Sequence, residues 1–343
     1  MNRAGSSTSG GLRPDAYPIP MPTALVIRTA GTNCDAELAR AFELAGAKTR
    51  LAHLEALVTD PSPIEKADLI GFPGGFSYGD DVASGRIFAM HTRLGLMDSL
   101  RGAIDRGACI IGICNGFQVL VQTGLLPGVE GHRAALTVNA GGSFISDWSG
   151  VEFSESSKCV WTRGLTGLDT DASVLPIAHG EGCFVAPDDT AKLLAQNGQI
   201  ALRYTEDVNG SVDRIAGICD PTGRVFGLMP HPERYLEWNR HPAWTRLPDE
   251  RKAAEPIGLR MFKNAVEAAS SVGAAMYCIT EAVNYANERR PFGKPLSVNQ
   301  AIQFPLVEQA TEAEMLRLFI FKTAWEIDKM SKPEVAIKLS DKV

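Results

Sequence analysis

The chain has 343 residues, a formal net charge of -6 and 22% charged residues. This acidic balance argues against a general nucleic-acid or anionic-membrane surface, and no apolar run of about 18 residues predicts a transmembrane helix. The seven cysteines include no CxxC pair, which argues against a disulfide scaffold or a zinc site and favours a reducing, cytoplasmic location.

The N-terminal part of the chain alternates between apolar strands and helices after residues 1–22, whose Ser, Gly and Pro content predicts a disordered tail. Strands are expected over residues 24–29, 48–54, 67–75 and 108–114. Helices are expected over residues 35–47 and 91–107 and directly after Cys114. Because residues 108–114 are apolar on both faces, they are predicted to be a central parallel strand of a doubly wound α/β fold.

Short strand-like runs recur in the next part of the chain, with turn residues between them. These runs are residues 133–139, 150–154, 174–180, 199–205, 214–220 and 224–230, and a closing helix is expected over 258–269. The pattern then changes to two long amphipathic helices, residues 273–289 and 297–330. The sequence therefore predicts a tail over 1–22, an α/β domain over 23–270 and a short all-α segment over 271–343.

Cys114 lies between Gly112 and Gly116 at the end of an apolar run, in "IIGICNGFQVL". The spacing G-x-C-x-G matches that of the serine nucleophile elbow, a strained turn between a strand and a helix. A helix that begins after Cys114 would favour thiolate, and the backbone N–H of Asn115 would face an oxyanion. A buried structural cysteine between packing glycines fits the same pattern, so the motif alone leaves both interpretations open.

A candidate base follows in "GLMPHPERYLEW", where His231 and Glu233 are two residues apart. On an extended segment they would face the same side. Glu233 would then hold the imidazole tautomer while His231 takes the thiol proton. The alternative is a proline-flanked surface loop in which both side chains are solvated.

Two glycine-containing segments are weaker candidates. Gly74 and Gly75 in "FPGGFSYGDD" follow a strand, so their backbone N–H groups could bind an anionic oxygen or simply form a turn. His179 and Glu181 in "AHGEGCF" form a second His/Glu pair. This pair is a competing base or a substrate or partner contact, and ranks behind His231.

Together these motifs resemble the class I (triad) glutamine amidotransferases and, more narrowly, the glutaminase subunits of phosphoribosylformylglycinamidine synthase. The resemblance covers about residues 23–269 and includes, in family order, "GTNCD", "GGFSYGDDVASGR", "GICNGFQVLVQTGLLPG", "PIAHGEG", "NGS...IAGICD" and "GLMPHPER". It implies a flavodoxin-like doubly wound sheet. Other cysteine hydrolases and a non-catalytic module with this fold are the alternatives, but the order Cys–His–Glu differs from that of α/β-hydrolases.

The resemblance also implies roles for individual residues. Cys114 is the expected nucleophile on the glutamine side-chain amide, His231 the general base and then acid, and Glu233 its orienting group. The remaining implied contacts are oxyanion N–H groups from Gly75 and Asn115, a turn shaped by Gly74, and a glutamine contact from Gln118.

The expected reaction releases ammonia through a thioester intermediate. In the family, a separate synthetase subunit uses this ammonia, with ATP and Mg2+, to convert formylglycinamide ribonucleotide to the amidine in purine biosynthesis. A small bridging subunit often completes the complex. We expect no cofactor and no metal in this chain, and neither nucleic acid nor membrane as a partner.

Residues from about 272 resemble part of the C-terminal helical domain of acyl-CoA dehydrogenases. In that family the residues that match Arg289, Phe292 and Gln300 typically lie near the FAD of a neighbouring subunit. The family's other domains are missing from this sequence, so we expect no working flavin site. A fused fragment is the favoured interpretation, and an oligomerisation or docking role is the alternative.

Overall fold

The computed structural model describes residues 21–169, 171–270, 289–290, 294 and 307. Their main feature is a nine-stranded sheet with the order β2-β1-β3-β4-β11-β10-β9-β6-β7. Its strands are β1 (Thr23–Arg28), β2 (Lys48–His53), β3 (Leu69–Phe72), β4 (Cys109–Ile113), β6 (Ile145–Phe153), β7 (Val174–His179), β9 (Ile200–Tyr204), β10 (Ile215–Cys219) and β11 (Val225–Leu228). A small antiparallel sheet pairs β5 (Ala135–Thr137) with β8 (Cys183–Val185).

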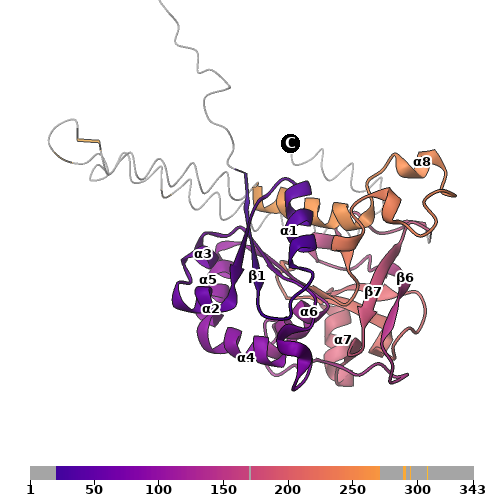
Figure 1. Cartoon of the computed structure of the whole chain (residues 1–343), viewed down its shortest axis with the longest axis horizontal. Coiled ribbons are helices and arrows are strands. Elements are labelled where there is room, and N and C mark those ends of the chain that lie inside the picture. The colour runs from indigo at the N-terminus through magenta and orange to yellow at the C-terminus, as the bar shows by residue number, and fades with distance from the viewer. Residues whose placement is uncertain (1–20, 170, 271–288, 291–293, 295–306, 308–343) are drawn as a thin grey trace, which may run out of the picture.

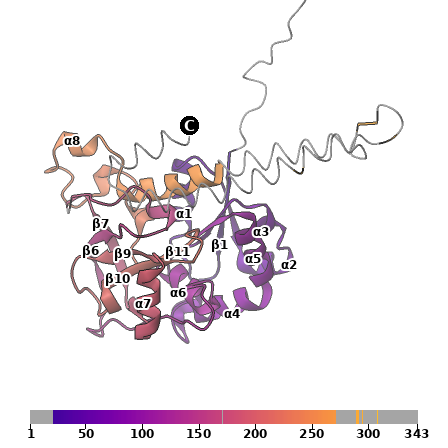
Figure 2. The ribbon, with the colours of Figure 1, turned by 180° about the vertical axis from the view of Figure 1, so that it is seen from behind.

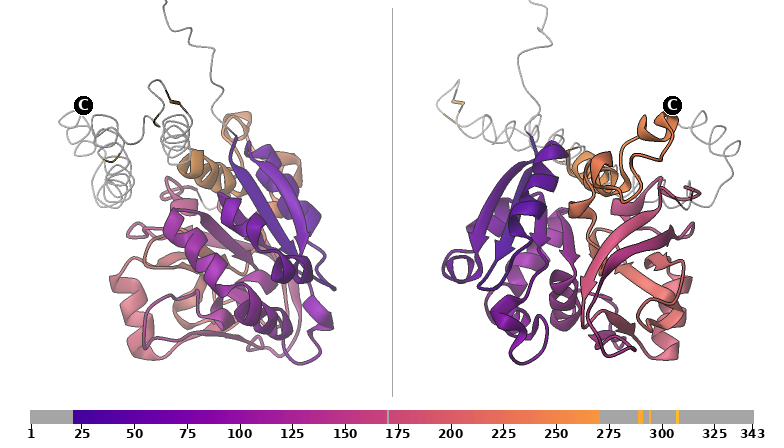
Figure 3. Two further views of the ribbon diagram at one scale, coloured as in Figure 1. Left: turned by 90° about the vertical axis from the view of Figure 1, so that its left-hand side faces the viewer. Right: turned by 45° about the vertical axis from the view of Figure 1, so that its right-hand side comes forward.

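The sheet has a parallel half and an antiparallel half. Strands β2, β1, β3, β4 and β11 are parallel neighbours, and β11, β10, β9, β6 and β7 are antiparallel neighbours. In both views of Figure 3 the indigo and purple strands form one side of the domain and the pink strands the other. The parallel order 2-1-3-4-11 is the flavodoxin-like order expected from the sequence.

Helices cover the sheet on two sides. The α-helices that carry labels are α1 (Asp35–Leu44), α2 (Leu54–Thr59), α3 (Ser62–Lys66), α4 (Arg86–Gly95), α5 (Met97–Arg106), α6 (Asn115–Thr123), α7 (Asp188–Gln196) and α8 (Asp249–Lys252). A further helix spans residues 257–270. Figures 1 and 2 show α1 and this last helix on the upper side of the domain, and α4, α6 and α7 on the lower side. No helix within the described ranges has the length and hydropathy needed to cross a bilayer.

Several elements differ from those expected. The helix predicted over 91–107 is two helices, α4 and α5, which meet at Leu96. The bend places buried Leu96 in the core and brings Gly95 against α2, where a Cβ on Gly95 would lie 2.8 Å from a methyl group of Val58. The sequence patterns also missed the short elements α2, α3 and β8 and the nine-residue helix α7.

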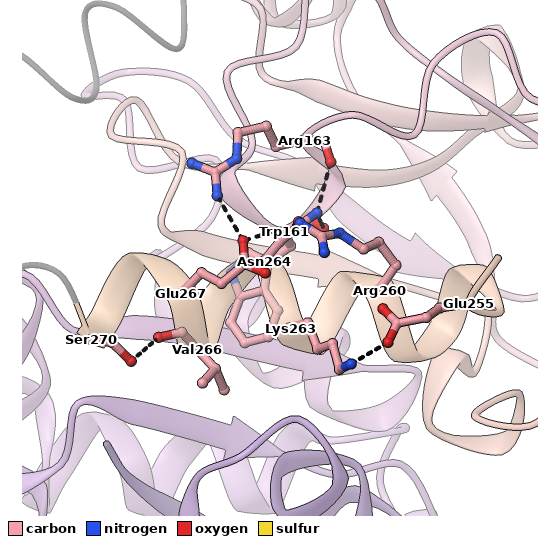
Figure 4. Close-up of polar contacts among 9 residues, drawn as sticks. All are labelled: Trp161, Arg163, Glu255, Arg260, Lys263, Asn264, Val266, Glu267 and Ser270. Carbon is pink, nitrogen blue, oxygen red and sulfur yellow. Dashed lines mark hydrogen bonds and ion pairs between the residues drawn. The ribbon is translucent and has the colours of Figure 1, made fainter. Parts of the chain in front are cut away.

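The helix over 257–270 belongs to the α/β domain. The Phe262 ring packs edge-on against Phe42 of α1, with 5.4 Å between ring centroids. Asn264 is fully buried, and its Nδ2 donates to the carbonyl oxygens of Trp161 at 3.0 Å and Arg163 at 2.8 Å (Figure 4). Arg260 adds an ion pair to Glu267 on the helix surface. The predicted closing helix is therefore confirmed as a structural part of this domain.

The predicted tail over 1–22 and helices over 273–289 and 297–330 lie almost entirely outside the described residues. The same applies to Phe292 and Gln300, while Arg289 is exposed.

Candidate active site

Cys114 lies on a strained turn between β4 and α6, as expected of a nucleophile elbow. Its φ of 51° and ψ of -107° are outside the regions that L-residues ordinarily adopt. The turn directs the N-terminus of α6 at the sulfur, and the helix dipole there favours negative charge. A residue that only fills a core does not need this backbone, so the geometry supports the nucleophile interpretation.

The two flanking glycines are required because backbone segments approach each other closely. A Cβ on Gly116 would lie 1.9 Å from the carbonyl oxygen of Phe72, and one on Gly112 would lie 2.5 Å from the carbonyl oxygen of Gly116. Strand β3 thus presses against the first turn of α6. A larger residue at position 116 would push the elbow away from β3, and one at position 112 would push α6 away from β4.

His231 follows β11, the strand next to β4, so it lies at the same end of the sheet as Cys114. Strands β4 and β11 are parallel neighbours with Ile113 opposite Leu228, and the Cys114 amide donates to the Leu228 carbonyl oxygen at 2.8 Å. The His231 amide donates to the Pro176 carbonyl oxygen at 2.8 Å. The carboxyl ends of parallel strands meet at one sheet edge, which brings residues from distant parts of the sequence together.

His231 and Glu233 form a buried hydrogen-bonded pair. His231 Nδ1 lies 2.6 Å from Glu233 Oε1, and the two side chains are 2% and 0% exposed. The predicted contact is confirmed, but the expected extended backbone is wrong. His231 caps a 3-10 turn over Pro232–Arg234, and this turn carries Glu233 back to the imidazole.

The environment favours a charged imidazole. Burial opposes the imidazolium, but the negative charges of the Glu233 carboxylate and of the Cys114 thiolate outweigh it and raise the pKa of His231 well above its ordinary value. His231 Nε2 is buried and has no hydrogen-bond partner within the described ranges. The Cys114 thiol donates to the Ala178 carbonyl oxygen at 3.6 Å. The free imidazole nitrogen is therefore available to exchange a proton with the thiol or a bound substrate.

The glycine loop after β3 lies against these residues. A Cβ on Gly74 would be 2.8 Å from His231 Cε1 and 3.4 Å from Cys114 Cβ. Gly75 has a φ of +135°, and the next residue, Phe76, donates its amide to the Gly31 carbonyl oxygen. In the described part of the chain we find no partner for the amide N–H of Gly75 or of Asn115. Both N–H groups therefore remain candidates for the oxyanion contacts that the sequence predicts.

Asn115 and Gln118 form a polar network on α6. Asn115 Nδ2 donates to Gln118 Oε1 at 3.0 Å and to Asp80 Oδ1 at 3.4 Å. Gln118 Nε2 donates to the Glu181 carbonyl oxygen at 2.7 Å. Gln118 therefore joins α6 to the 179–182 loop, and its contact with glutamine stays a prediction.

His179 and Glu181 do not pair with each other. His179 Nδ1 contacts Asn139 Oδ1 at 3.0 Å, whereas Glu181 Oε2 accepts from the Ser84 amide at 3.3 Å. Burial and the neighbouring His231 lower the pKa of His179 to about 4. His179 is thus neutral at ordinary pH and lacks the carboxylate that a triad histidine needs, which favours His231 as the base.

Cys34 is a site residue that sequence reasoning missed. It caps α1, and its Sγ, one ring nitrogen of His231 and a carboxylate oxygen of Glu233 all lie within 4.8 Å of one another. Its only sequence signal was the motif "GTNCD", which matches the family but assigns no contact to the thiol. Cys34 follows β1, and the order β1-β3-β4-β11 brings it to the edge that holds the triad.

Comparisons with known proteins show the family of the chain. The model of the CobB/CobQ-like glutamine amidotransferase domain matches residues 21–267. The PurQ subunit of phosphoribosylformylglycinamidine synthase from Dehalococcoides mccartyi is 42% identical over 257 residues, which cover 72% of this chain and 98% of that protein. The chain belongs to the PurQ family of glutamine amidotransferases.

Other PurQ relatives support the same assignment. The PurQ subunit of Methanococcus maripaludis strain C5 is 39% identical over 270 residues, with 98% of that protein covered. A solved chain from the structure of PurLQS from Thermotoga maritima matches with a TM-score of 0.57 and 32% identity, covering 72% of this chain and 99% of that chain. Residues 263–341 match the C-terminal domain model of acyl-CoA dehydrogenases, which confirms the second resemblance.

Proposed function

We propose that Cys114, His231 and Glu233 perform the chemistry of this PurQ-family chain, the glutaminase component of phosphoribosylformylglycinamidine synthase in purine biosynthesis. One observation carries the residue assignment: a cysteine on a strained elbow lies beside a buried His–Glu pair at the ends of neighbouring parallel strands. The alternative of a non-catalytic module does not account for a buried, charged pair next to a thiol.

The geometry suggests a sequence of proton transfers. His231 takes the proton of the Cys114 thiol, and the sulfur attacks the carbonyl carbon of the glutamine side-chain amide. The amide N–H groups of Gly75 and Asn115 stabilise the oxyanion. His231 then gives its proton to the amide nitrogen, ammonia leaves, and a thioester remains. Water, deprotonated by His231, hydrolyses the thioester to glutamate and frees the thiol.

Glu233 supports this cycle by orienting His231 and stabilising its charged form. The raised pKa of His231 means that the imidazolium persists after proton transfer instead of returning the proton at once. We assign Gly74 the task of keeping His231 and Cys114 close, because no side chain fits between them. We assign Gln118 and the 179–182 loop to glutamine binding, since Gln118 bonds to the Glu181 carbonyl oxygen and the loop directly follows Ala178, which contacts the Cys114 thiol.

The ammonia is proposed to pass to a synthetase subunit, with a small bridging subunit in the same complex. The PurQ relatives are named as subunits, and the Thermotoga maritima structure is titled PurLQS. ATP and Mg2+ are assigned to the synthetase, and no cofactor is proposed for this chain. We also propose a cytoplasmic location and an α/β domain over 23–270, with no flavin site in residues 271–343.

Glutamate release from glutamine tests this proposal. The chain is assayed alone, and then with the synthetase subunit, ATP and formylglycinamide ribonucleotide. We expect a large rise on mixing that Cys114→Ala abolishes, whereas ammonia-dependent synthesis by the same complex continues. Cys183→Ala, at a buried thiol on β8, is the matched control and keeps glutamine use. Glutamine hydrolysis by the Cys114→Ala complex would disprove the nucleophile assignment.

A further inference from the structure

We propose that Cys34, His231 and Glu233 form a site for a soft divalent metal ion such as Zn2+, which would inhibit glutamine hydrolysis. One ligand atom from each residue lies within 4.8 Å of the others, and all three residues are buried. They follow β1 and β11, which are separate strands of the parallel half of the sheet. The expectation of no zinc site rested on missing CxxC pairs, a pattern that cannot detect ligands so far apart in sequence.

The donor set suits zinc. A thiolate, an imidazole and a carboxylate are common zinc ligands, at about 2.3, 2.0 and 2.1 Å from the metal. Tetrahedral coordination at these lengths separates the ligands by roughly 3.3–3.8 Å, so side-chain movements of about 1 Å bring the cluster to binding distance. Water would take the fourth position.

The carboxylate has an unused polar atom. Glu233 Oε2 is buried without a hydrogen-bond partner within the described residues, while Oε1 lies 2.6 Å from His231 Nδ1. A buried polar atom without a partner is costly, and coordination to a metal would satisfy it. The Glu233 carboxylate and a Cys34 thiolate would also balance the two positive charges of the ion.

The surroundings of Cys34 permit metal binding. Arg234 Nη2 donates to Sγ at 3.0 Å, and the thiol donates to Asn33 Oδ1 at 3.2 Å. Loss of the thiol proton on metal binding frees the bond to Asn33, and the guanidinium still stabilises the sulfur's negative charge. Arg234 thus holds the Cys34 sulfur in place and leaves a lone pair free to bind the metal.

Inhibition follows from the proposed role of His231, on which this part of the inference rests. An ion that His231 shares with Glu233 takes Nδ1, because the carboxylate lies on that side of the ring, and it displaces the 2.6 Å hydrogen bond between them. The imidazole then loses the carboxylate that orients it and stabilises its charged form, so zinc and catalysis exclude each other.

The test uses the full chain with Co2+ as a spectroscopic substitute for Zn2+. Thiolate-to-Co2+ charge transfer gives a near-ultraviolet band that reports a Cys ligand independently of activity. The variants are Cys34→Ser, which can keep the hydrogen bonds to Asn33 and Arg234, Cys114→Ser and the control Cys183→Ser. We expect the band in the wild type, Cys114→Ser and Cys183→Ser, and its loss in Cys34→Ser. Zn2+ affinity, measured by competition with an indicator, should fall at least tenfold in Cys34→Ser alone.

Activity in the presence of the synthetase subunit provides the second measurement. Zn2+ should inhibit the wild type, and Cys34→Ser should raise the inhibition constant at least tenfold when each variant is compared with its own rate in metal-free buffer. A persistent band in Cys34→Ser, its loss in Cys114→Ser, or no binding by the wild type would overturn the proposed site. Metal bound at Cys34 without inhibition would instead contradict the base role of His231, leaving the site itself established.

Discussion

The imidazole of His231 and the carboxylate of Glu233 are joined by a 2.6 Å hydrogen bond in a region that water does not reach. In such an environment the carboxylate stabilises an imidazolium far more than it would at the surface. The same hydrogen bond therefore orients the His231 ring and stabilises its positive charge.

Replacing Glu233 separates these two effects. Glu233→Gln keeps the size of the side chain and can still contact Nδ1, but it cannot balance an imidazolium. We expect glutamine hydrolysis in the complex to fall roughly 10²–10⁴-fold. The matched control is Glu237→Gln, a half-exposed carboxylate paired with Arg40, which should change the rate less than about twofold. Similar rates for the two variants would exclude the orienting role.

The strain at Cys114 can be measured as stability. Cys114→Ala and Cys114→Gly both lack the sulfur, but only glycine adopts a φ of 51° without cost. We expect the Gly variant to be more stable than the Ala variant by about 1–2 kcal/mol in urea unfolding.

The same pair of substitutions at Cys219 is the control, since this buried residue in β10 is not among those with positive φ. There, Gly should be less stable than Ala by roughly 0.5–1 kcal/mol. The same order of stability at both positions would show that the elbow stores no strain.

Gly74 is expected to tolerate no side chain. In Gly74→Ala the new methyl group would lie 2.8 Å from His231 Cε1, so the imidazole must move. A displacement of this order should lower kcat about 10²-fold. Gly102→Ala is the control, because Gly102 lies in α5 with no atom within 4 Å of an added Cβ. It should keep full activity and gain up to about 1 kcal/mol of stability. Full activity in Gly74→Ala would contradict this role.

His179 should make the protein sensitive to acid. Its pKa is lowered to about 4 by burial and by His231, whereas the unfolded chain has the ordinary value of 6.5. Between these values the unfolded state binds a proton that the folded state does not. The contribution of neutral His179 to the free energy of unfolding is therefore complete above pH 6.5. About 3 kcal/mol of this contribution is lost as the pH falls towards 4.

His179→Gln removes this titration. We expect its free energy of unfolding to fall less steeply than that of the wild type between pH 6.5 and 4, whatever its absolute stability. Parallel curves from urea titrations across this range would mean that His179 titrates similarly in both states.

Truncation tests the domain boundary. A chain that ends at Ser270 keeps the helix over 257–270 and should retain its unfolding midpoint and its glutamine hydrolysis in the complex. A chain that ends at Glu255 loses buried Phe262 and Asn264, and should be destabilised by at least about 3 kcal/mol. Aggregation or loss of partner binding by the chain that ends at Ser270 would show that residues 271–343 have a role.

Strong local patterns made much of the fold predictable. The apolar runs that became β1, β3 and β4, and the glycines around Cys114, have signals that do not depend on distant parts of the chain. Helices α2 and α3 are too short to show a full apolar period. The bend at Leu96 brings Gly95 against Val58 of α2, a contact between elements that sequence periodicity cannot show.

The site was predictable only in part for the same reason. His231 and Glu233 were found because they are two residues apart, although the backbone between them is a 3-10 turn. Cys34 was missed because its neighbours in space come from another strand. Asn139, which orients His179, was missed in the same way. Contacts of this kind follow from strand order, which the motifs alone do not give.

The pairing of β4 with β11 also constrains when the enzyme can become active. A ribosome synthesises Cys114 long before Val225–Leu228, and the helix over 257–270 later still. Until those segments emerge, the nascent chain carries a thiol without its base. On the proposed assignment of His231 as the base, fragments left by interrupted translation would not consume glutamine, and ammonia production would begin only once nearly the whole amidotransferase domain has folded.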